Sequence, residues 1–232
     1  AENNQYVLDK MREHFWDGKT LDSKDLDMPF ILPVVGNHEG HPLDYDNYDD
    51  PDSFFKKRIF PAFESLIGKE RVQDLSDKGF YTFKDEKRNI RFLSINSNVN
   101  NLYNSHAVAS PTNPLHILNN IAQTLYESEN YKEKVIILTH IPIADDSSQT
   151  VFARIFKILM ERFKDTLSCS LSAHTHNDQL KFYRGEDKKH MMMEFISPSL
   201  TTFGGINPSF RVYEFSGVGE FRNYVQFRFN ID

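Results

Sequence analysis

The spacing of apolar residues divides the chain into helical and extended stretches. Apolar side chains recur every three to four positions in residues 5–16, 115–129 and 150–163, and Pro51 with Asp52 marks the start of a further helix. Short runs rich in β-branched and aromatic residues predict strands, which cover residues 30–35, 80–83, 90–95, 135–138, 169–172, 179–183, 192–196, 210–215 and 221–229. Helices and strands intermingle without repeats or low-complexity linkers, so we expect one α/β domain over residues 1–232.

Histidines come directly after three of these predicted strands. A Gly-Asn-His-Glu motif follows residues 30–35, one histidine follows residues 135–138, and a His-Thr-His motif follows residues 169–172. The polar side chains concerned are Asn37, His38, His140, His174 and His176. Sites in open α/β sheets are built at the carboxyl ends of neighbouring strands. We therefore expect the three strands to share one sheet and their histidines to converge.

Imidazole nitrogens and an amide oxygen are suitable ligands for zinc, manganese or iron. Each residue also has a plainer interpretation. Asn37 follows a glycine and could simply shape a turn, His38 could be a surface histidine, and His140 could be a core residue. His174 and His176 would point to opposite faces of an extended segment, so both reach one site only if the chain bends at Thr175.

Composition and charge narrow the class of protein. The net charge is −6 and no stripe of Lys and Arg is present, which argues against a general nucleic-acid binder. No apolar run approaches the roughly 18 residues of a membrane span, and the first residues do not resemble a signal sequence. An acidic loop at residues 44–52 hints at calcium, but it lacks the glycine and distal glutamate of an EF-hand, so we expect a solvated loop.

Cysteine and glycosylation signals say little about the compartment. Cys169 is the only cysteine and lies in a predicted strand, so no disulfide can form within this chain. No Asn-x-Ser/Thr acceptor is present, because Asn207 is followed by proline.

Three histidine motifs and three longer segments together resemble the calcineurin-like metallophosphoesterases, and more narrowly their acid sphingomyelinase branch. The superfamily resemblance rests on GNHE, a histidine after a strand and a GHxH-type element, in that order. The narrower one rests on stretches similar to that branch's GFY with LR-ISLNTN, GHIPPG, and PS-TP with LNPGYRVY. In this chain these are Lys78-Gly79-Phe80-Tyr81 with residues 90–98, His140-Ile141-Pro142, and residues 198–202 with 207–213.

The resemblance covers roughly residues 30–215 and implies a metallophosphoesterase-type β-sandwich flanked by helices. The family begins with a D-x-H and a G-D-x-x element, and neither is found before residue 36. We therefore expect a carboxyl-terminal portion of the catalytic domain that lacks its first strands, with residues 1–27 as the helix and loop after the second element. Ala173 and Thr139 stand where glycine is usual, and the alanine implies either a cost of about 1 kcal/mol or a small backbone shift.

The implied activity is metal-dependent phosphodiester hydrolysis. Two dications about 3.5–4 Å apart, zinc by expectation, would clamp the phosphate and stabilise an in-line transition state. By resemblance, Asn37, His140 and His174 hold one ion and His176 holds the other with the D-x-H pair, so this chain alone would hold at most one. His38 would be the general acid. The expected substrate is a sphingomyelin-like lipid or a nucleotide.

His41 and His106 are further candidates for lining a substrate cleft, with a plain surface role as the alternative.

A second reading of the whole chain is a catalytically degenerate subunit with a structural role in a larger assembly. A third is that the amino-terminal half is a separate polypeptide that completes the site. All four metal-type ligands and His38 are intact, which favours a functional parent enzyme, although we expect this chain alone to be inactive. The resemblance implies a secreted or lysosomal protein, which neither the cysteine count nor glycosylation acceptors support.

Overall fold

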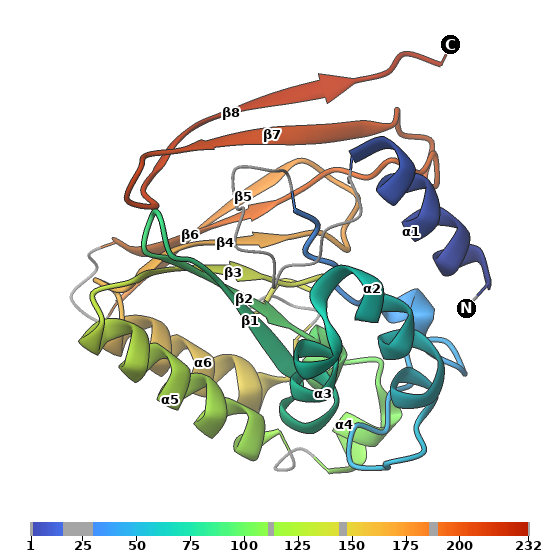
Figure 1. Ribbon diagram of the computed structural model, residues 1–232, viewed down its shortest axis with the longest axis horizontal. Coiled ribbons are helices and arrows are strands. Elements are labelled where there is room, and N and C mark those ends of the chain that lie inside the picture. Colours follow the sequence, from blue (N-terminus) through green and yellow to red (C-terminus); the bar gives the residue numbers. More distant parts are fainter. Residues whose placement is uncertain (1, 16–29, 111–113, 144–147, 186–189, 232) are drawn as a thin grey trace.

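A six-stranded mixed sheet forms the centre of the molecule (Figure 1). The computed structural model describes residues 2–15, 30–110, 114–143, 148–185 and 190–231. The sheet has the order β1-β2-β3-β4-β6-β5, with β2, β3, β4 and β6 parallel and β1 and β5 antiparallel at its two edges. The strands are β1 Phe80–Asp85, β2 Ile90–Ile95, β3 Lys134–Leu138, β4 Leu167–Ser172, β5 Gln179–Arg184 and β6 His190–Ile196, followed by a separate hairpin of β7 Ser209–Phe215 and β8 Phe221–Arg228.

Helices cover one face of this sheet and one of its ends. The α-helices are α1 Glu2–Phe15, α2 Glu64–Ile67, α3 Lys69–Lys78, α4 Ser105–Ala109, α5 Leu115–Asn130 and α6 Thr150–Arg162. Short turns of other helix types are η1 Asn37–Glu39, η2 Phe55–Ile59, η3 Phe60–Phe63 and η4 Ser97–Asn100. The helices α5 and α6 lie side by side along the sheet, whereas α1, α2 and α3 gather at its end (Figure 1).

The face under α5 and α6 is the larger part of the core. Ile121 and Leu125 of α5 and Phe156 of α6 are completely buried, and they pack in one cluster with Leu93 of β2 and Ile137 of β3. The apolar spacing that predicted these helices is the spacing that meets the sheet, because residues three and four apart share one helix face. Their predicted positions are confirmed within a few residues.

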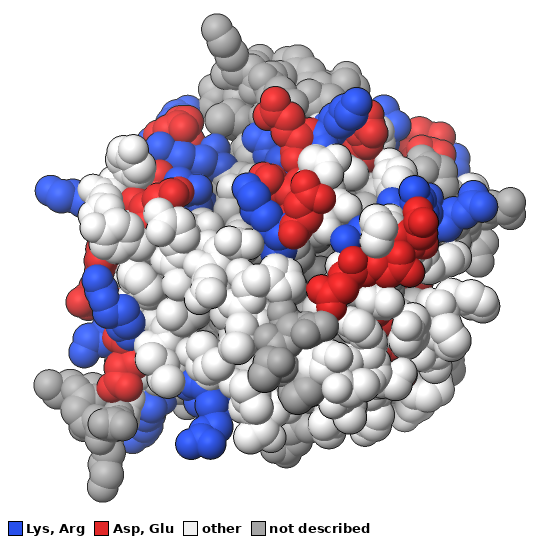
Figure 2. Space-filling view, turned by 90° about the horizontal axis from the view of Figure 1, so that it is seen from below, with Lys and Arg blue, Asp and Glu red and all other residues white. Residues whose placement is uncertain are grey.

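Surface charges of both signs lie close together on the side seen from below, beside a broad area without charged side chains (Figure 2). One pair joins the two long helices: the Arg162 guanidinium of α6 donates to both carboxylate oxygens of Glu129 on α5, at 2.7 and 2.9 Å. The pair is exposed, so solvent screens it and the helices are held mainly by the core beneath them. No helix in the described part of the chain is long and apolar enough to cross a membrane.

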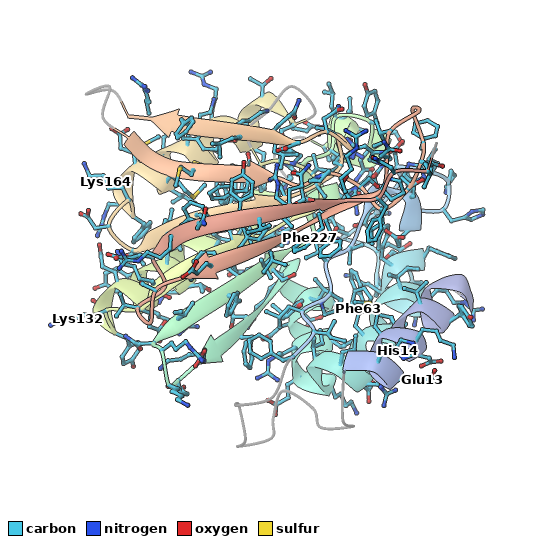
Figure 3. The ribbon with its side chains drawn as sticks, turned by 90° about the horizontal axis from the view of Figure 1, so that it is seen from above. Glu13, His14, Phe63, Lys132, Lys164 and Phe227 are labelled. Carbon is cyan, nitrogen blue, oxygen red and sulfur yellow. The ribbon has the colours of Figure 1, made fainter. Side chains whose placement is uncertain are left out.

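The hairpin β7–β8 covers the opposite face of the sheet (Figure 3). Phe195 of β6 is 1% exposed, and its ring lies 5.5, 4.5 and 6.0 Å from the rings of Tyr213, Phe221 and Tyr224. Side chains on the hairpin alternate, so one set faces the sheet and the other faces outward; Phe227, labelled in Figure 3, belongs to the outward set. Two packed β-layers with helices outside confirm the predicted α/β sandwich.

One predicted strand is wrong. Residues 30–35 form no strand and pair with none. They cross the sheet face that β7–β8 also covers. The ring centroids of Phe30 and Phe83 lie 4.6 Å apart there. The Pro33 carbonyl accepts hydrogen bonds from the Tyr81 hydroxyl at 2.8 Å and the Ser94 hydroxyl at 3.2 Å, in place of a strand ladder. Proline cannot donate to a ladder, and the apolar side chains are buried equally well on the face of a sheet.

The expected common sheet is therefore correct only in part. β3 and β4 are parallel neighbours, as predicted, but the segment ending at Val35 reaches the site from above the sheet.

The helix predicted from Pro51 is broken into η2, η3 and α2, and two helices, α3 and α4, were not predicted. In α3 only Val72 and Leu75 are apolar, so the spacing signal is weak. Residues 16–27 of the predicted first helix and loop lie outside the described residues.

Candidate active site

The Gly-Asn-His-Glu motif forms the single turn η1, which is anchored through the backbone of Gly36. The Gly36 amide donates to the Glu39 carboxylate at 2.8 Å, and the Gly36 carbonyl accepts from the Asn98 side-chain amide at 3.0 Å. Asn37 is buried, whereas His38 is largely exposed. The turn therefore holds the Asn37 amide inward and leaves the His38 imidazole accessible to solvent.

His140 stands just past the end of β3, where the loop is tied to its neighbours. The Thr139 amide donates to the Leu171 carbonyl at 3.0 Å, and the Ala173 amide donates to the His140 carbonyl at 2.9 Å. These bonds continue the β3–β4 contact by two residues beyond the strands. His140 is consequently carried to the same edge of the sheet as the loop after β4.

The loop after β4 bends sharply at its two histidines. His174 has φ 73° and His176 has φ 61°, both in the left-handed region that non-glycine residues rarely adopt. The Thr175 amide donates to the Ala173 carbonyl at 2.9 Å, which closes a three-residue turn around His174. The bend brings both histidines to one hollow instead of opposite faces. The sequence analysis predicted that both histidines could reach one site only if the chain bends at Thr175.

Three of the predicted residues converge at the Asn37 amide oxygen. Asn37 Oδ1 lies 2.8 Å from His140 Nε2 and 3.3 Å from His174 Nδ1, and the two imidazole rings are 5.2 Å apart. Burial lowers the pKa of His140 to about 4, with a smaller contribution from the neighbouring imidazoles of His174, His38 and His176. His140 is therefore neutral at pH 7, the protonation state in which an imidazole has a free lone pair.

The converging atoms open into a cavity of about 640 Å³, which we call the site hollow. His38 and His176 line it together with the three converging residues, and Phe203 stands edge-on to the His176 ring with centroids 5.9 Å apart. The remaining lining residues are Thr175, Asn177, Thr201, Gly204 and Ile206. A hollow of this volume accommodates a small ligand or the head of a larger one.

The donor set can be compared with the needs of a divalent metal. Within the described ranges, no three His, Cys, Asp or Glu side chains are placed to hold one ion, so a dication at this point would need the Asn37 amide oxygen as its third donor. Ligand atoms held tetrahedrally at 2.0–2.1 Å from zinc lie about 3.4 Å apart. The 3.3 Å between Asn37 Oδ1 and His174 Nδ1 is close to that value, whereas the 2.8 Å between Asn37 Oδ1 and His140 Nε2 is a hydrogen-bond distance that would have to lengthen around an ion. The set of Asn37, His140 and His174 is thus chemically suited to one dication.

Two other candidate histidines lie elsewhere. The His41 ring packs 5.6 Å from Phe54 in a separate hollow, and His106 Nε2 lies 3.1 Å from an Asp49 carboxylate oxygen. Neither lines the site hollow. A role for His41 and His106 in lining a substrate cleft stays a prediction.

Sequence reasoning missed Asp44, which contacts the nitrogen end of the Asn37 side-chain amide, on the side away from His140 and His174. Its Oδ1 accepts from the Asn37 side-chain amide at 2.7 Å and from the Asn101 side-chain amide at 3.1 Å. The residue belongs to the acidic loop at residues 44–52, which was expected to be a solvated loop. Its single local signal was a short acidic side chain seven residues after Asn37, which is too common to single it out.

Asp46 in the same loop is a buried carboxyl group. Its side chain accepts from Asn96 at 2.8 Å, but its Oδ1 has no hydrogen-bond partner in the described structure. Burial raises the pKa of Asp46 from 3.8 to about 6. A raised pKa in the folded state means that the group contributes stability below pH 4 and loses that contribution as the pH rises through 6.

We therefore expect the Asp46→Asn variant to gain stability relative to the parent between pH 4.5 and pH 7. The gain should be about 2 kcal/mol in the free energy of unfolding, because most of the interval between the unfolded and folded pKa values lies above pH 4.5. Urea denaturation at both pH values, with a chelator present, measures it. Asp52→Asn, at an exposed carboxylate in the same loop, should show no such pH dependence. Equal changes for Asp46→Asn at both pH values would contradict the burial argument.

Comparison with curated proteins finds phosphodiesterases. Over 210 residues the chain is 29% identical to sphingomyelin phosphodiesterase A of Dictyostelium discoideum, covering 87% of this chain and 35% of that protein. It is 26% identical over 194 residues to human sphingomyelin phosphodiesterase, covering 81% and 30%. It is also 24% identical over 221 residues to the mouse cyclic GMP-AMP phosphodiesterase SMPDL3A, covering 87% and 48%. The chain thus spans about a third to a half of the length of these relatives.

The family described as calcineurin-like phosphoesterase matches residues 7–178. That match covers most of the chain and includes the turn η1, His140 and the loop with His174 and His176. The remaining residues carry β5, β6 and the hairpin β7–β8, which complete the two β-layers. The chain belongs to the calcineurin-like phosphoesterase family.

Proposed function

We propose that this chain forms part of a metal-dependent phosphodiesterase of the sphingomyelin phosphodiesterase type. The observation that carries the proposal is the convergence of Asn37 Oδ1, His140 Nε2 and His174 Nδ1 beside a hollow that His38 also lines. The relatives named for sphingomyelin and for cyclic GMP-AMP act on different molecules, but both molecules contain a phosphodiester. The shared bond is therefore the class of substrate that we assign.

In this proposal Asn37, His140 and His174 hold one dication, and His176 contributes to a second. Bound dications polarise phosphoryl oxygens and lower the pKa of water, and this chemistry is what the metal supplies. Zinc, with manganese or iron as alternatives, suits the nitrogen-rich donor set. Among the chain's own residues, His140 presents a neutral imidazole at this edge of the sheet, because burial lowers its pKa to about 4.

His38 has a separate task in the proposal. It is the residue of η1 that stays accessible and lines the hollow without contacting Asn37 Oδ1 in any described hydrogen bond. An imidazole there can carry a proton to the oxygen of the departing alcohol, which otherwise leaves as an alkoxide. The hollow accommodates the phosphate and part of the group attached to it, and we assign a lipid or a nucleotide to that group.

The first test is metal binding by the chain itself. We expect it to bind one dication with useful affinity, and we expect His174→Ala to weaken that binding more than the 10–100-fold typical of losing an outer partner, because a direct donor is removed. Isothermal titration with zinc and metal analysis after gel filtration measure both quantities. His14→Ala on α1, at an exposed histidine that does not line the site hollow, is the matched control for surface binding.

Two tightly held ions in the isolated chain, or unchanged affinity after His174→Ala, would contradict the ligand assignment. The competing function is a structural subunit without catalysis. Absence of metal-dependent phosphodiester hydrolysis in a protein that carries the full ligand set would favour that alternative.

A further inference from the structure

We infer that Asp44 is a positioning residue that fixes the orientation of the Asn37 side-chain amide, so that its oxygen and not its nitrogen faces His140 and His174. The inference rests on the proposed function, because it concerns the donor atom that Asn37 offers to a dication. It goes beyond that function in assigning a role to a residue outside the donor set.

The orientation of an amide must be fixed by its neighbours, because its oxygen and nitrogen ends have nearly the same shape. Asn37 is 5% exposed, so water has little access to it. On one side of the amide, Asp44 Oδ1 lies 2.7 Å from Asn37 Nδ2. A carboxylate oxygen can only accept a hydrogen bond, so the end of the amide that faces Asp44 must be the NH₂ group.

Asp44 is itself held in place. Its Oδ1 also accepts from Asn101 Nδ2 at 3.1 Å, and its backbone amide donates to the Asn37 carbonyl at 3.2 Å. Asn101 is completely buried and follows η4, the asparagine-rich turn after β2. Asp44 therefore links the turn η1 to the buried end of η4 at the sheet edge.

The turn η4 also holds the backbone on either side of the converging residues. The Ser97 hydroxyl accepts from the Ile141 amide at 2.8 Å, directly after His140. The Asn98 side chain donates to the Gly36 carbonyl at 3.0 Å, directly before Asn37. The turn η4 thus fixes the backbone beside two of the converging residues, while Asp44 fixes the amide itself.

The backbone conformation at Asp44 allows substitutions that change the side chain without straining the chain. Asp44 has φ 64°, in the left-handed region where Asp, Asn and Gly are the residues best tolerated. Asp44→Asn keeps an oxygen that can accept from Asn37, whereas Asp44→Gly removes the acceptor without straining the backbone. Asp46→Asn changes a carboxylate two residues away that does not contact Asn37 and is the matched control.

Two measurements test the inference. Hydrogen exchange of the Asn37 side-chain amide, followed by ¹⁵N NMR in the metal-free chain, should be at least about tenfold faster in Asp44→Gly and unchanged in Asp44→Asn, because only the first loses the acceptor. Titration with Co²⁺, followed by its absorption spectrum, should show about 10–100-fold weaker binding for Asp44→Gly, the usual effect of removing an outer partner. Asp44→Asn and Asp46→Asn should bind Co²⁺ as the parent does.

Equal Co²⁺ affinity in the parent and Asp44→Gly would overturn the inference while leaving the proposed function in place. Unchanged exchange of the Asn37 amide in Asp44→Gly would overturn it without any reference to metal. A parent chain that binds no Co²⁺ would instead contradict the proposed function, and the role assigned to Asp44 with it.

Discussion

His38→Ala is expected to lower turnover of an alkyl phosphodiester by about 10²–10⁴-fold while leaving metal content unchanged, in a protein that carries the full ligand set. This fall in turnover is the one expected when a poor leaving group no longer receives a proton. The imidazole lines the hollow but has no described bond to Asn37, so removing it should not disturb the donor set. Turnover under saturating substrate and metal analysis of the purified variant measure the two quantities.

The leaving group is the control for this prediction. A nitrophenyl phosphodiester departs without a proton, so its hydrolysis should lose much less activity in His38→Ala. His140→Ala should remove metal and activity together for both substrates, because it deletes a donor at the convergence point. If the two leaving groups show equal losses in His38→Ala, the assignment of the general acid is wrong.

Phe195→Ala is expected to lower the free energy of unfolding by about 3–5 kcal/mol, the range for deleting a buried aromatic ring. The ring is enclosed between the central sheet and the hairpin by Tyr213, Phe221 and Tyr224, with centroid distances of 4.5–6.0 Å. Bulky neighbours on several sides cannot all move into the space left behind, so a cavity remains. Urea denaturation followed by circular dichroism measures the change.

Phe227→Ala is the matched control on the same hairpin. Phe227 is 46% exposed and stacks on Phe210 with centroids 5.0 Å apart, so its loss should cost about 1 kcal/mol or less. If both variants lost the same stability, the hairpin would not be held to the sheet through Phe195. A loss at Phe195 should also perturb a second hollow beside the site, because β7 contributes Phe210 and Arg211 to its lining.

The elements that the sequence predicted well are those that bury a whole face. The helices α5 and α6 and the strands β2, β3 and β4 meet the core along their length, so their apolar spacing is complete. The helix α3 has only two apolar residues in its ten positions, and the spacing gave no signal. Residues 30–35 show the reverse case, because an apolar run that lies across a sheet has the same composition as a strand within it.

In the candidate site too, some residues could be predicted from local sequence patterns and others could not. Asn37, His140 and His174 could be proposed because each follows a recognisable run of apolar residues, and two of those runs are strands. Asp44 could not, because its contacts join residue 37 to residue 101 through a fold that a local pattern does not contain. Local patterns predict which side chains reach the edge of a sheet, but the partners that orient them come from loops distant in sequence.

The left-handed backbone at His174 and His176 has an evolutionary consequence. Glycine or asparagine would adopt these angles with less strain, so a loop selected only for stability would be expected to carry those residues. Under the proposed function, the two imidazoles keep these strained positions because they serve as metal donors. Sequence drift after a loss of function should erase this loop early, since each histidine that is lost there would relax the backbone.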